Sequence, residues 1–406
     1  MRARAWIAVF ILWLSACNAL AQTDSVSIDS DTVTQTKPRK AILQNLQLKG
    51  YVKQLQTFIL VRGLDSLLTE NLLHNRLNFN YTIDTSLHVM AEVRTRIFYG
   101  DLLRQVPIYP QLIDSGNDVW DLSAMPVKSR SLLVHTMLDR AYLEYTKNQL
   151  EVRLGRQRIN WGLNLVWNPN DIFNAYSYLD FDYEERPGSD AVRVRYFSGF
   201  AGGAEFAARL TTDPEKRTIA GLYKFNRSEY DIQFLGGVVG REAVLGLGWA
   251  GSIQDAGFKG EFTYFHPYRD PLDASGQLLA SVSADYSFAS SLYLHGSVLY
   301  NSKGEKNPQT LLLQAFQPGR LSVKELSPYR YNVFGQVSYT FHPLLTGRLA
   351  TIYFPEDQAF FLNPVLTYSA FPNLDLDAIG QLFMDSEQGE FKATTKVIYA
   401  RVKWSF

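Results

Sequence analysis

The sequence predicts an all-β fold, a transmembrane antiparallel β-barrel of about 18 strands (16–18). Three observations predict it. Apolar and polar residues alternate with a period of two over most of the chain after residue 43, as in strands with one apolar face. The connections between these strands alternate between short and long. Tyr and Phe are abundant, at 23 and 25 residues, as expected of barrels with aromatic belts at membrane interfaces.

The N-terminus has the three parts of a secretory signal peptide, predicted at residues 1–21. Arg2 and Arg4 precede an apolar run at 5–16, which at about 12 residues is too short to span a bilayer. Small residues then alternate at 19–21, as a cleavage site requires.

A second reading of the same segment involves the only cysteine of the chain. Leu14-Ser15-Ala16-Cys17 resembles a lipobox and would make Cys17 a lipid anchor. Cleavage after Ala21 would instead leave a chain without cysteine and therefore without disulfides. Residues 22–42, rich in Ser, Thr and Asp and then basic, are predicted to be a flexible periplasmic leader before a barrel at 43–406.

The same alternation recurs in successive segments along the rest of the chain, and each such segment is predicted to be a strand. In the last one, the even-numbered residues from Ile398 to Phe406 are apolar or aromatic, and the odd-numbered ones are mostly polar. The predicted strands are residues 43–58, 73–83, 86–99, 134–146, 149–158, 189–198, 202–211, 217–226, 229–238, 242–253, 257–267, 277–288, 291–301, 329–341, 345–354, 359–370, 373–384 and 391–406.

The length of each connection depends on whether the strand before it is odd-numbered or even-numbered in this series. Connections after even-numbered strands are tight, as at 84–85 and 147–148. The long ones all follow odd-numbered strands and are predicted as outer loops at 100–133, 158–188 and 302–328. A soluble sandwich has no reason to sort its loops in this way, whereas bacterial membrane barrels have short periplasmic turns and longer outer loops. An even strand count places both termini on the periplasmic side.

The C-terminal strand resembles the assembly signal of bacterial outer-membrane barrels. It alternates through Trp404 and ends on Phe406. The resemblance implies that the barrel-assembly machinery is a partner, and that the chain lies in the cell outer membrane in contact with its lipid.

Alternation also assigns side chains to the barrel interior, because charges facing lipid would cost about 2–4 kcal/mol each at the bilayer centre. The predicted inward arginines are Arg94, Arg96, Arg140, Arg153, Arg193 and Arg195. Two interpretations stay open: a salt-bridge ladder with Glu92, Glu144 and Glu151, or a cationic stripe that concentrates anions. The later strands direct another set inward: Asp231, Asp285, Asp375, Asp377, Lys259, Glu261 and Arg348.

The third outer loop, 158–188, carries an acidic group made of Asp171, Asp180, Asp182, Glu184 and Glu185. In position and charge it is similar to the third loop of the general porins, which folds into the lumen. We therefore predict a constriction loop whose carboxylates face the arginines. The alternative is an external loop packed by its own aromatic residues.

A further resemblance involves the segment Gly155 to Gly162, which reads Gly-Arg-Gln-Arg-Ile-Asn-Trp-Gly, then Asn-Pro-Asn-Asp at 168–171, and Val-Arg-Val-Arg-Tyr at 192–196. This arrangement looks like a pattern in porin-like and polysaccharide-export barrels, including the alginate-export barrels. The resemblance implies contacts between a passing anionic chain and five arginines: Arg153, Arg156, Arg158, Arg193 and Arg195.

These observations predict a porin-like channel for passive diffusion of small polar solutes, anions among them. The alternatives are an exporter of anionic polysaccharide and a non-conducting barrel, either a surface anchor or a barrel enzyme. His295 and Ser297 form a His-x-Ser pair, but alternation turns them away from a lipid substrate, so no enzyme is predicted. Balanced charge gives no footprint for nucleic acid, so no nucleic-acid partner is expected. The histidines lack metal-ligand spacing, and neither a metal nor a cofactor is expected. The glycines proposed for close contact in an oligomer are Gly246, Gly248, Gly260 and Gly296.

Overall fold

We describe the protein from a computed structural model. It describes residues 45–63, 67–114, 118–180, 188–199, 202–268, 275–305, 321–387 and 389–406, and the chain from Asn45 onward is one compact unit. The predicted signal peptide, lipobox and leader lie outside these residues. No helix within the described part of the chain is long and apolar enough to cross a membrane.

The described residues form nineteen β-strands. They are β1 (Leu46–Val61), β2 (Leu68–Thr82), β3 (Leu87–Gly100), β4 (Ser123–Lys128), β5 (Leu133–Lys147), β6 (Leu150–Gln157), β7 (Ser189–Phe197), β8 (Gly203–Arg209), β9 (Thr218–Arg227), β10 (Tyr230–Val239), β11 (Glu242–Ile253), β12 (Ala256–Pro267), β13 (Gln277–Ser287), β14 (Leu292–Asn301), β15 (Tyr331–His342), β16 (Leu345–Phe354), β17 (Ala359–Phe371), β18 (Leu374–Glu387) and β19 (Glu390–Ser405).

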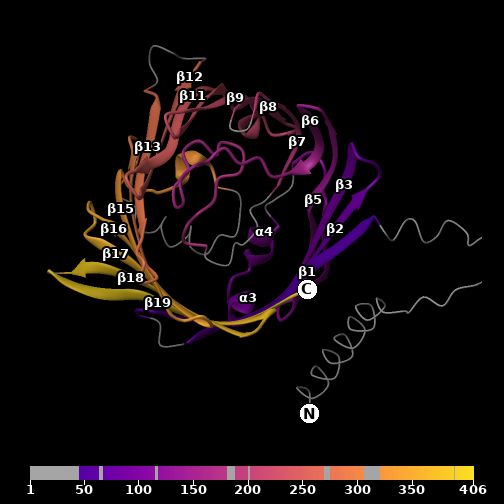
Figure 1. The fold of residues 1–406 in the computed structure, drawn as a ribbon. Helices are drawn as coiled ribbons and strands as arrows, with labels where there is room; N and C mark the ends of the chain where they lie inside the picture. The colour runs from indigo at the N-terminus through magenta and orange to yellow at the C-terminus, as the bar shows by residue number, and fades with distance from the viewer. Residues whose placement is uncertain are drawn as a thin grey trace, which may run out of the picture. The chain divides into compact units, whose positions relative to one another are not determined.

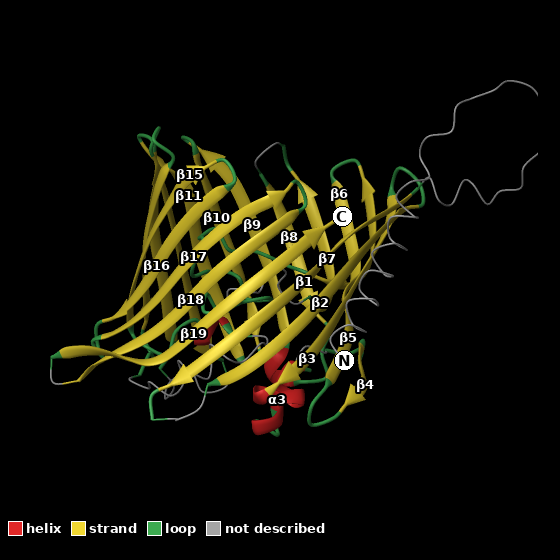
Figure 2. Cartoon of the chain, turned by 90° about the horizontal axis from the view of Figure 1, so that it is seen from below, coloured by secondary structure: helices red, strands yellow, loops and turns green. Residues whose placement is uncertain are grey.

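Eighteen of these strands close into an antiparallel barrel, which confirms the predicted fold class and strand number. The barrel closes where β1 pairs with β19, from Tyr51 opposite Ser405 to Val61 opposite Thr395. Closure leaves no open sheet edge, so backbone groups are paired around the whole ring. Figure 1 looks along the axis of this ring, and Figure 2 shows the strands tilted across it.

The predicted outer loop 100–133 contains structure that the sequence reading missed. It holds two short helices, α3 (Asp101–Gln105) and α4 (Tyr109–Ile113), and the strand β4. Within the described residues β4 pairs only with β5, outside the closed ring. The 3-10 turns η1 (Pro214–Lys216) and η2 (Val323–Glu325) occur in later loops. Segments of five residues carry too few periodic positions to be recognised as helices.

Short and long connections lie at opposite rims, as predicted. On the short-turn rim, Ser228 and Glu229 both have positive φ, at 53° and 67°, as a two-residue hairpin turn requires. Asn45 and Phe406 lie at this same rim, since Asn45 accepts from the amide of Thr82 and Phe406 pairs with Gly50.

The barrel is apolar outside and polar inside. Outward side chains such as Leu245 and Phe371 are 67% and 68% exposed. Inward ones such as Arg76 and Glu261 are fully buried, at 0% each. A water-soluble sandwich would have the reverse arrangement, because exposed apolar surface on this scale is costly in water. The inverted pattern is that of a barrel whose outer wall faces lipid.

The four glycines proposed for contact between subunits have different surroundings. Gly246 and Gly248 lie on the inner face, where an added Cβ would meet Asn170 of the interior loop at 2.7 and 2.8 Å, so that prediction is wrong for them. Gly260 faces outward but the ring of Trp249 covers it, 2.1 Å from an added Cβ. Gly296 alone of the four keeps open space outside.

Candidate functional site

The six predicted arginines all lie on the inner face of β3, β5, β6 and β7. The inward face of β5 changes at a β-bulge, because Glu92 pairs with Arg140 whereas Val93 pairs with Leu138. The bulge leaves Asp139 unpaired between them and turns both Asp139 and Arg140 inward. Strict alternation cannot place two neighbouring residues on one face, so Asp139 was missed.

Asp139 is the centre of the first of two charge clusters. Its carboxylate lies 2.6 Å from Arg76 Nη1 and 3.0 Å from Arg94 Nη2. Arg76 also forms an ion pair with Glu92. The side chains of Arg76 and Asp139 are 1% and 2% exposed. Arg76 also donates to Asn78 through Nε at 3.1 Å, but only the carboxylates balance the buried positive charge.

The second cluster lies nearer the short-turn rim. Arg153 Nε is 2.5 Å from Glu144 and 3.2 Å from Glu151. Arg195 is 3.5 Å from Glu151 through Nη1. The cluster continues through Glu205 of β8, which lies 2.8 Å from Arg193 Nε and 3.0 Å from Arg195 Nε.

The loop between β3 and β5 covers the arginines at the long-loop rim. Arg96 donates to the carbonyl of Ile113 at the end of α4 (3.0 Å). Farther along the loop, Asp118 forms a 2.6 Å ion pair with Arg209, and the carbonyl of Trp120 accepts from Arg156 Nη2 at 2.6 Å. This loop therefore accepts hydrogen bonds from Arg96, Arg156 and Arg209 that these arginines could otherwise donate to groups in the lumen.

These pairings favour the ladder interpretation over a free cationic stripe. Within the described part of the chain, Arg94, Arg153, Arg193 and Arg195 each lie within 3.5 Å of a carboxylate. The predicted ladder partners Glu92, Glu144 and Glu151 all take part, and Asp139 and Glu205 join them. Paired charges largely cancel at a distance, so this wall presents a weak net field to a solute.

The segment after β6, residues 158–180, folds inside the barrel. Its apolar side chains form a core with the inner wall from β7 to β18, and Figure 1 shows this magenta segment within the ring. The buried loop members are Ile159, Trp161, Val166, Trp167, Ile172, Phe173, Ala175 and Leu179. At its far end, the carbonyl of Leu179 accepts from Gln381 of β18 at 2.8 Å, so the loop spans the lumen. We call this segment the crossing loop.

One carboxylate holds the crossing loop to the wall. Glu261 of β12 accepts the backbone N–H groups of Leu163 (2.5 Å), Asn164 (2.7 Å) and Asn170 (2.8 Å). Three amides converging on one carboxyl group hold the loop by three hydrogen bonds at once, and each of these buried N–H groups would be costly to leave unpaired. The sequence predicts that Glu261 points inward but indicates no role for it, because its partners are backbone amides about 100 residues earlier in the chain.

Side chains of the loop add further contacts with the wall. Asn170 accepts from Thr263 at 2.7 Å and donates to the carbonyl of Leu247 at 3.1 Å. Trp161 donates its ring N–H to Glu205 at 2.6 Å, which joins the loop to the second charge cluster. Asn164 accepts from Ser283 at 2.7 Å. The position of the loop is thus fixed by hydrogen bonds on several strands.

The acidic constriction predicted for this loop is only partly within the described residues. Asp171 is fully buried at 0% exposure, so it cannot present its carboxylate to lumen water, and that expectation is wrong. Asp180 is partly exposed. Asp182, Glu184 and Glu185 lie outside the described residues. The predicted fold of the loop into the lumen agrees with the structure, whereas Asp171 does not present a carboxylate to the arginines across the lumen.

Space for the loop comes from the glycines of β11, which gives a testable prediction. Gly248→Val would place a branched side chain 2.8 Å from the amide of Asn170 and 2.9 Å from Leu163. We expect the loop to shift away from β11 while the barrel stays folded. Limited proteolysis should then cut within 163–172, and Gly296→Val, which projects into open space, should leave the pattern unchanged. Equal protection in both variants would contradict this role of Gly248.

The His-x-Ser pair does not have the geometry of a nucleophile and its base. His295 and Ser297 both point inward and are each 5% exposed. Ser297 donates its hydroxyl to the carbonyl of Val282 at 3.2 Å. A catalytic serine would instead hydrogen-bond to the histidine. No cluster of metal-ligating side chains occurs among the residues that the structure describes.

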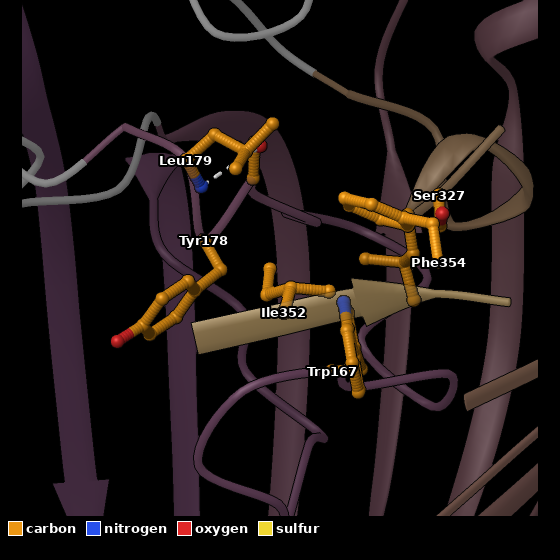
Figure 3. Close-up of a pocket in the computed structure, with 8 residues that line it drawn as sticks. Trp167, Tyr178, Leu179, Ser327, Ile352 and Phe354 are labelled. Atoms are coloured by element: carbon orange, nitrogen blue, oxygen red, sulfur yellow. Dashed lines mark hydrogen bonds between the residues drawn. The ribbon is translucent and has the colours of Figure 1, made fainter. Parts of the chain in front are cut away.

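A small pocket lies between the crossing loop and the wall near η2. Trp167 and Leu179 of the loop face Ile352 and Phe354 of β16 across it. Figure 3 shows that the Tyr178 hydroxyl points away from this pocket. Burial raises the pKa of Tyr178 to about 12, and the nearby positive charge of Arg348 acts in the opposite direction.

Similarity to solved structures is confined to the fold. Acinetobacter baumannii OccAB1 matches with a TM-score of 0.55 at 11% identity, over 89% of this chain and 97% of that one. Pseudomonas aeruginosa OccK5 (OpdH) matches with a TM-score of 0.55 at 8% identity, over 89% and 99%. Pseudomonas aeruginosa OccK9 (OpdG) matches at 0.54 and 11%, over 90% and 99%.

These three proteins are outer-membrane porins, and the chain shares their barrel fold along almost its whole length. No protein-family model and no curated protein matches its sequence.

Proposed function

We propose that the protein is an outer-membrane channel for passive diffusion of small polar solutes. The observation that carries the proposal is the crossing loop, which divides the interior of an 18-strand barrel instead of lying outside it. A wall of this size encloses far more space than its own inward side chains fill. A loop fixed across that space sets the width of the remaining path and thereby the size of solute that passes.

Three further features support this proposal. The outer wall is apolar and the inner wall is charged, as a water-filled path through lipid requires. The chain shares its fold with porins. At the short-turn rim, the Trp404 and Phe406 rings lie 5.0 Å apart on the outer face, in keeping with a C-terminal signal read by the barrel-assembly machinery. On this proposal that rim, with Asn45 and Phe406, faces the periplasm.

The paired ladder determines what selectivity we expect from the channel. Since its arginines are joined to carboxylates, the ladder alone gives weak preference between anions and cations. An exporter of anionic polysaccharide would need a continuous row of free cations along the path. Of the arginines carried over from the export barrels, Arg153, Arg156, Arg193 and Arg195 are paired with carboxylates. The pairing favours diffusion over export.

A planar-bilayer measurement on the purified, folded barrel tests the proposal. We expect steady single-channel openings in KCl, and swelling of liposomes in small sugars but not in large oligosaccharides. Heat-dependent gel mobility establishes beforehand that the barrel is folded. A folded barrel that gives neither openings nor swelling would overturn the channel proposal.

A further inference from the structure

The inner wall facing the ladder carries basic side chains without carboxylate partners. Lys259 of β12 and Arg348 of β16 point inward with Glu261 and Ala350, respectively. Among the described residues, neither has an ion pair with a carboxylate, in contrast to the ladder arginines. Carboxylates also point inward here, since Glu261 lies on β12 and Asp285 of β13 pairs in register with His295 of β14.

Among the described residues, several polar atoms on this wall and on the crossing loop beside it are buried without a hydrogen-bond partner. They include Nε of Arg348 and Nε2 of His295 on the wall and the hydroxyl of Tyr178 on the loop. His295 is 95% buried, since it is 5% exposed, whereas Arg348 and Tyr178 remain partly exposed toward the interior. Leaving a buried polar atom unpaired is costly, so native proteins rarely keep several together without a ligand or water to satisfy them.

Two of these groups pack against one aromatic ring of the inner wall, and the third comes from the neighbouring strand. The ring of Phe334 on β15 lies 4.9 Å from that of Tyr178 and 5.3 Å from that of His295. Arg348 comes from the next strand, where it pairs in register with Ser338 of β15. The charge of Arg348 is close enough to Tyr178 to influence its titration. A loop residue and two wall strands thus place their free donors together.

We propose that Tyr178, His295 and Arg348 form a binding subsite for an oxyanion group, a carboxylate or phosphate, of a solute in transit. The inference rests on the proposed channel function and adds the chemistry that the channel selects. A guanidinium and a phenol hydroxyl both donate, and His295 can donate through Nε2 in the matching tautomer. The oxyanion would accept the bonds that these atoms lack, with Lys259 adding positive charge.

The subsite explains how a channel with a neutralised ladder can still discriminate between solutes. The ladder arginines already bond to carboxylates of the wall, so a solute anion must displace those partners to bind there. At the Arg348 subsite no partner has to leave. The crossing loop supplies Tyr178 and also limits access to the subsite. The channel would therefore select solutes by size and by charge at the same place.

The test uses folded barrel in detergent, with sodium acetate or sodium phosphate replacing sodium chloride at constant ionic strength. Binding to the native state raises the unfolding midpoint, followed by tryptophan fluorescence. We expect the wild-type midpoint to rise with either oxyanion and the rise to be lost in Arg348→Gln. Arg401→Gln is the matched control, since Arg401 is a lumen cation paired with Asp377 at 2.8 Å and carries the same charge.

A second variant keeps the test decisive if Arg348→Gln fails to fold. Tyr178→Phe removes only the unpartnered hydroxyl, so it should raise the midpoint without oxyanion and reduce the oxyanion-dependent rise. An absent wild-type rise, or a rise that both variants retain, would overturn the subsite. Oxyanion binding without conductance would overturn the channel and leave the subsite standing, whereas conductance without binding would do the opposite.

Discussion

Glu261→Ala is expected to widen the channel while leaving the barrel closed. The substitution removes the acceptor for the amides of Leu163, Asn164 and Asn170. Each stranded buried N–H costs about 1–3 kcal/mol, so the docked loop loses several kcal/mol relative to a released one. Single-channel conductance should rise by about twofold or more, because conductance follows the narrowest cross-section of a pore.

The matched controls for this prediction are Glu261→Gln and Glu242→Gln. Glu261→Gln keeps one acceptor oxygen at the same place, so we expect an intermediate conductance and a noisier open level. Glu242 lies near the rim in a 2.8 Å pair with Lys324, away from the loop amides, and its substitution should leave conductance unchanged. If Glu261→Ala conducts as the wild type does, the loop does not set the width of the path.

The sequence alone predicts the strands of the barrel, but it does not predict the contacts that the crossing loop makes inside the barrel. Each strand carries its own signal, because alternation is local, and all the strands of the closed ring were predicted to within a few residues. The partners of Glu261 and Glu205 are set by a loop that folds back over many strands, and no local pattern records this. Asp139 was missed for a different reason, since a single bulge reverses the inward face and nothing in the sequence around residue 139 marks it.

The region around Arg348 likewise shows what the sequence predicts and what it does not. Alternation placed Arg348, Lys259 and His295 on the inner face, as the structure does. Whether such a residue is paired depends on its neighbours across the sheet and on Tyr178, which arrives from the crossing loop. A list of inward charges therefore predicts a polar lumen but cannot separate paired arginines from free ones.

The largest loss of stability is expected from Asp139→Asn. Asp139 lies between Arg76 (2.6 Å) and Arg94 (3.0 Å), and its side chain is 2% exposed. A neutral amide leaves the two guanidinium groups close together with one carboxylate fewer. Breaking a buried pair from one side costs about 3–5 kcal/mol, because the remaining charge stays buried. Urea unfolding of the barrel in lipid vesicles should show a loss of this size in the free energy of unfolding.

Two comparisons separate charge imbalance from a general effect of losing a carboxylate. Asp231→Asn alters an exposed carboxylate that only accepts from Asn226 at 2.8 Å, so it should change the free energy of unfolding by no more than about 0.5 kcal/mol. Adding Arg94→Met to Asp139→Asn removes the surplus charge and should restore part of the loss, since Arg76 keeps its pair with Glu92. If the double variant is less stable than Asp139→Asn by the full cost of Arg94→Met alone, the two residues are not coupled. The bulge would then serve only to bend β5, and the buried charges would owe their stability to other neighbours.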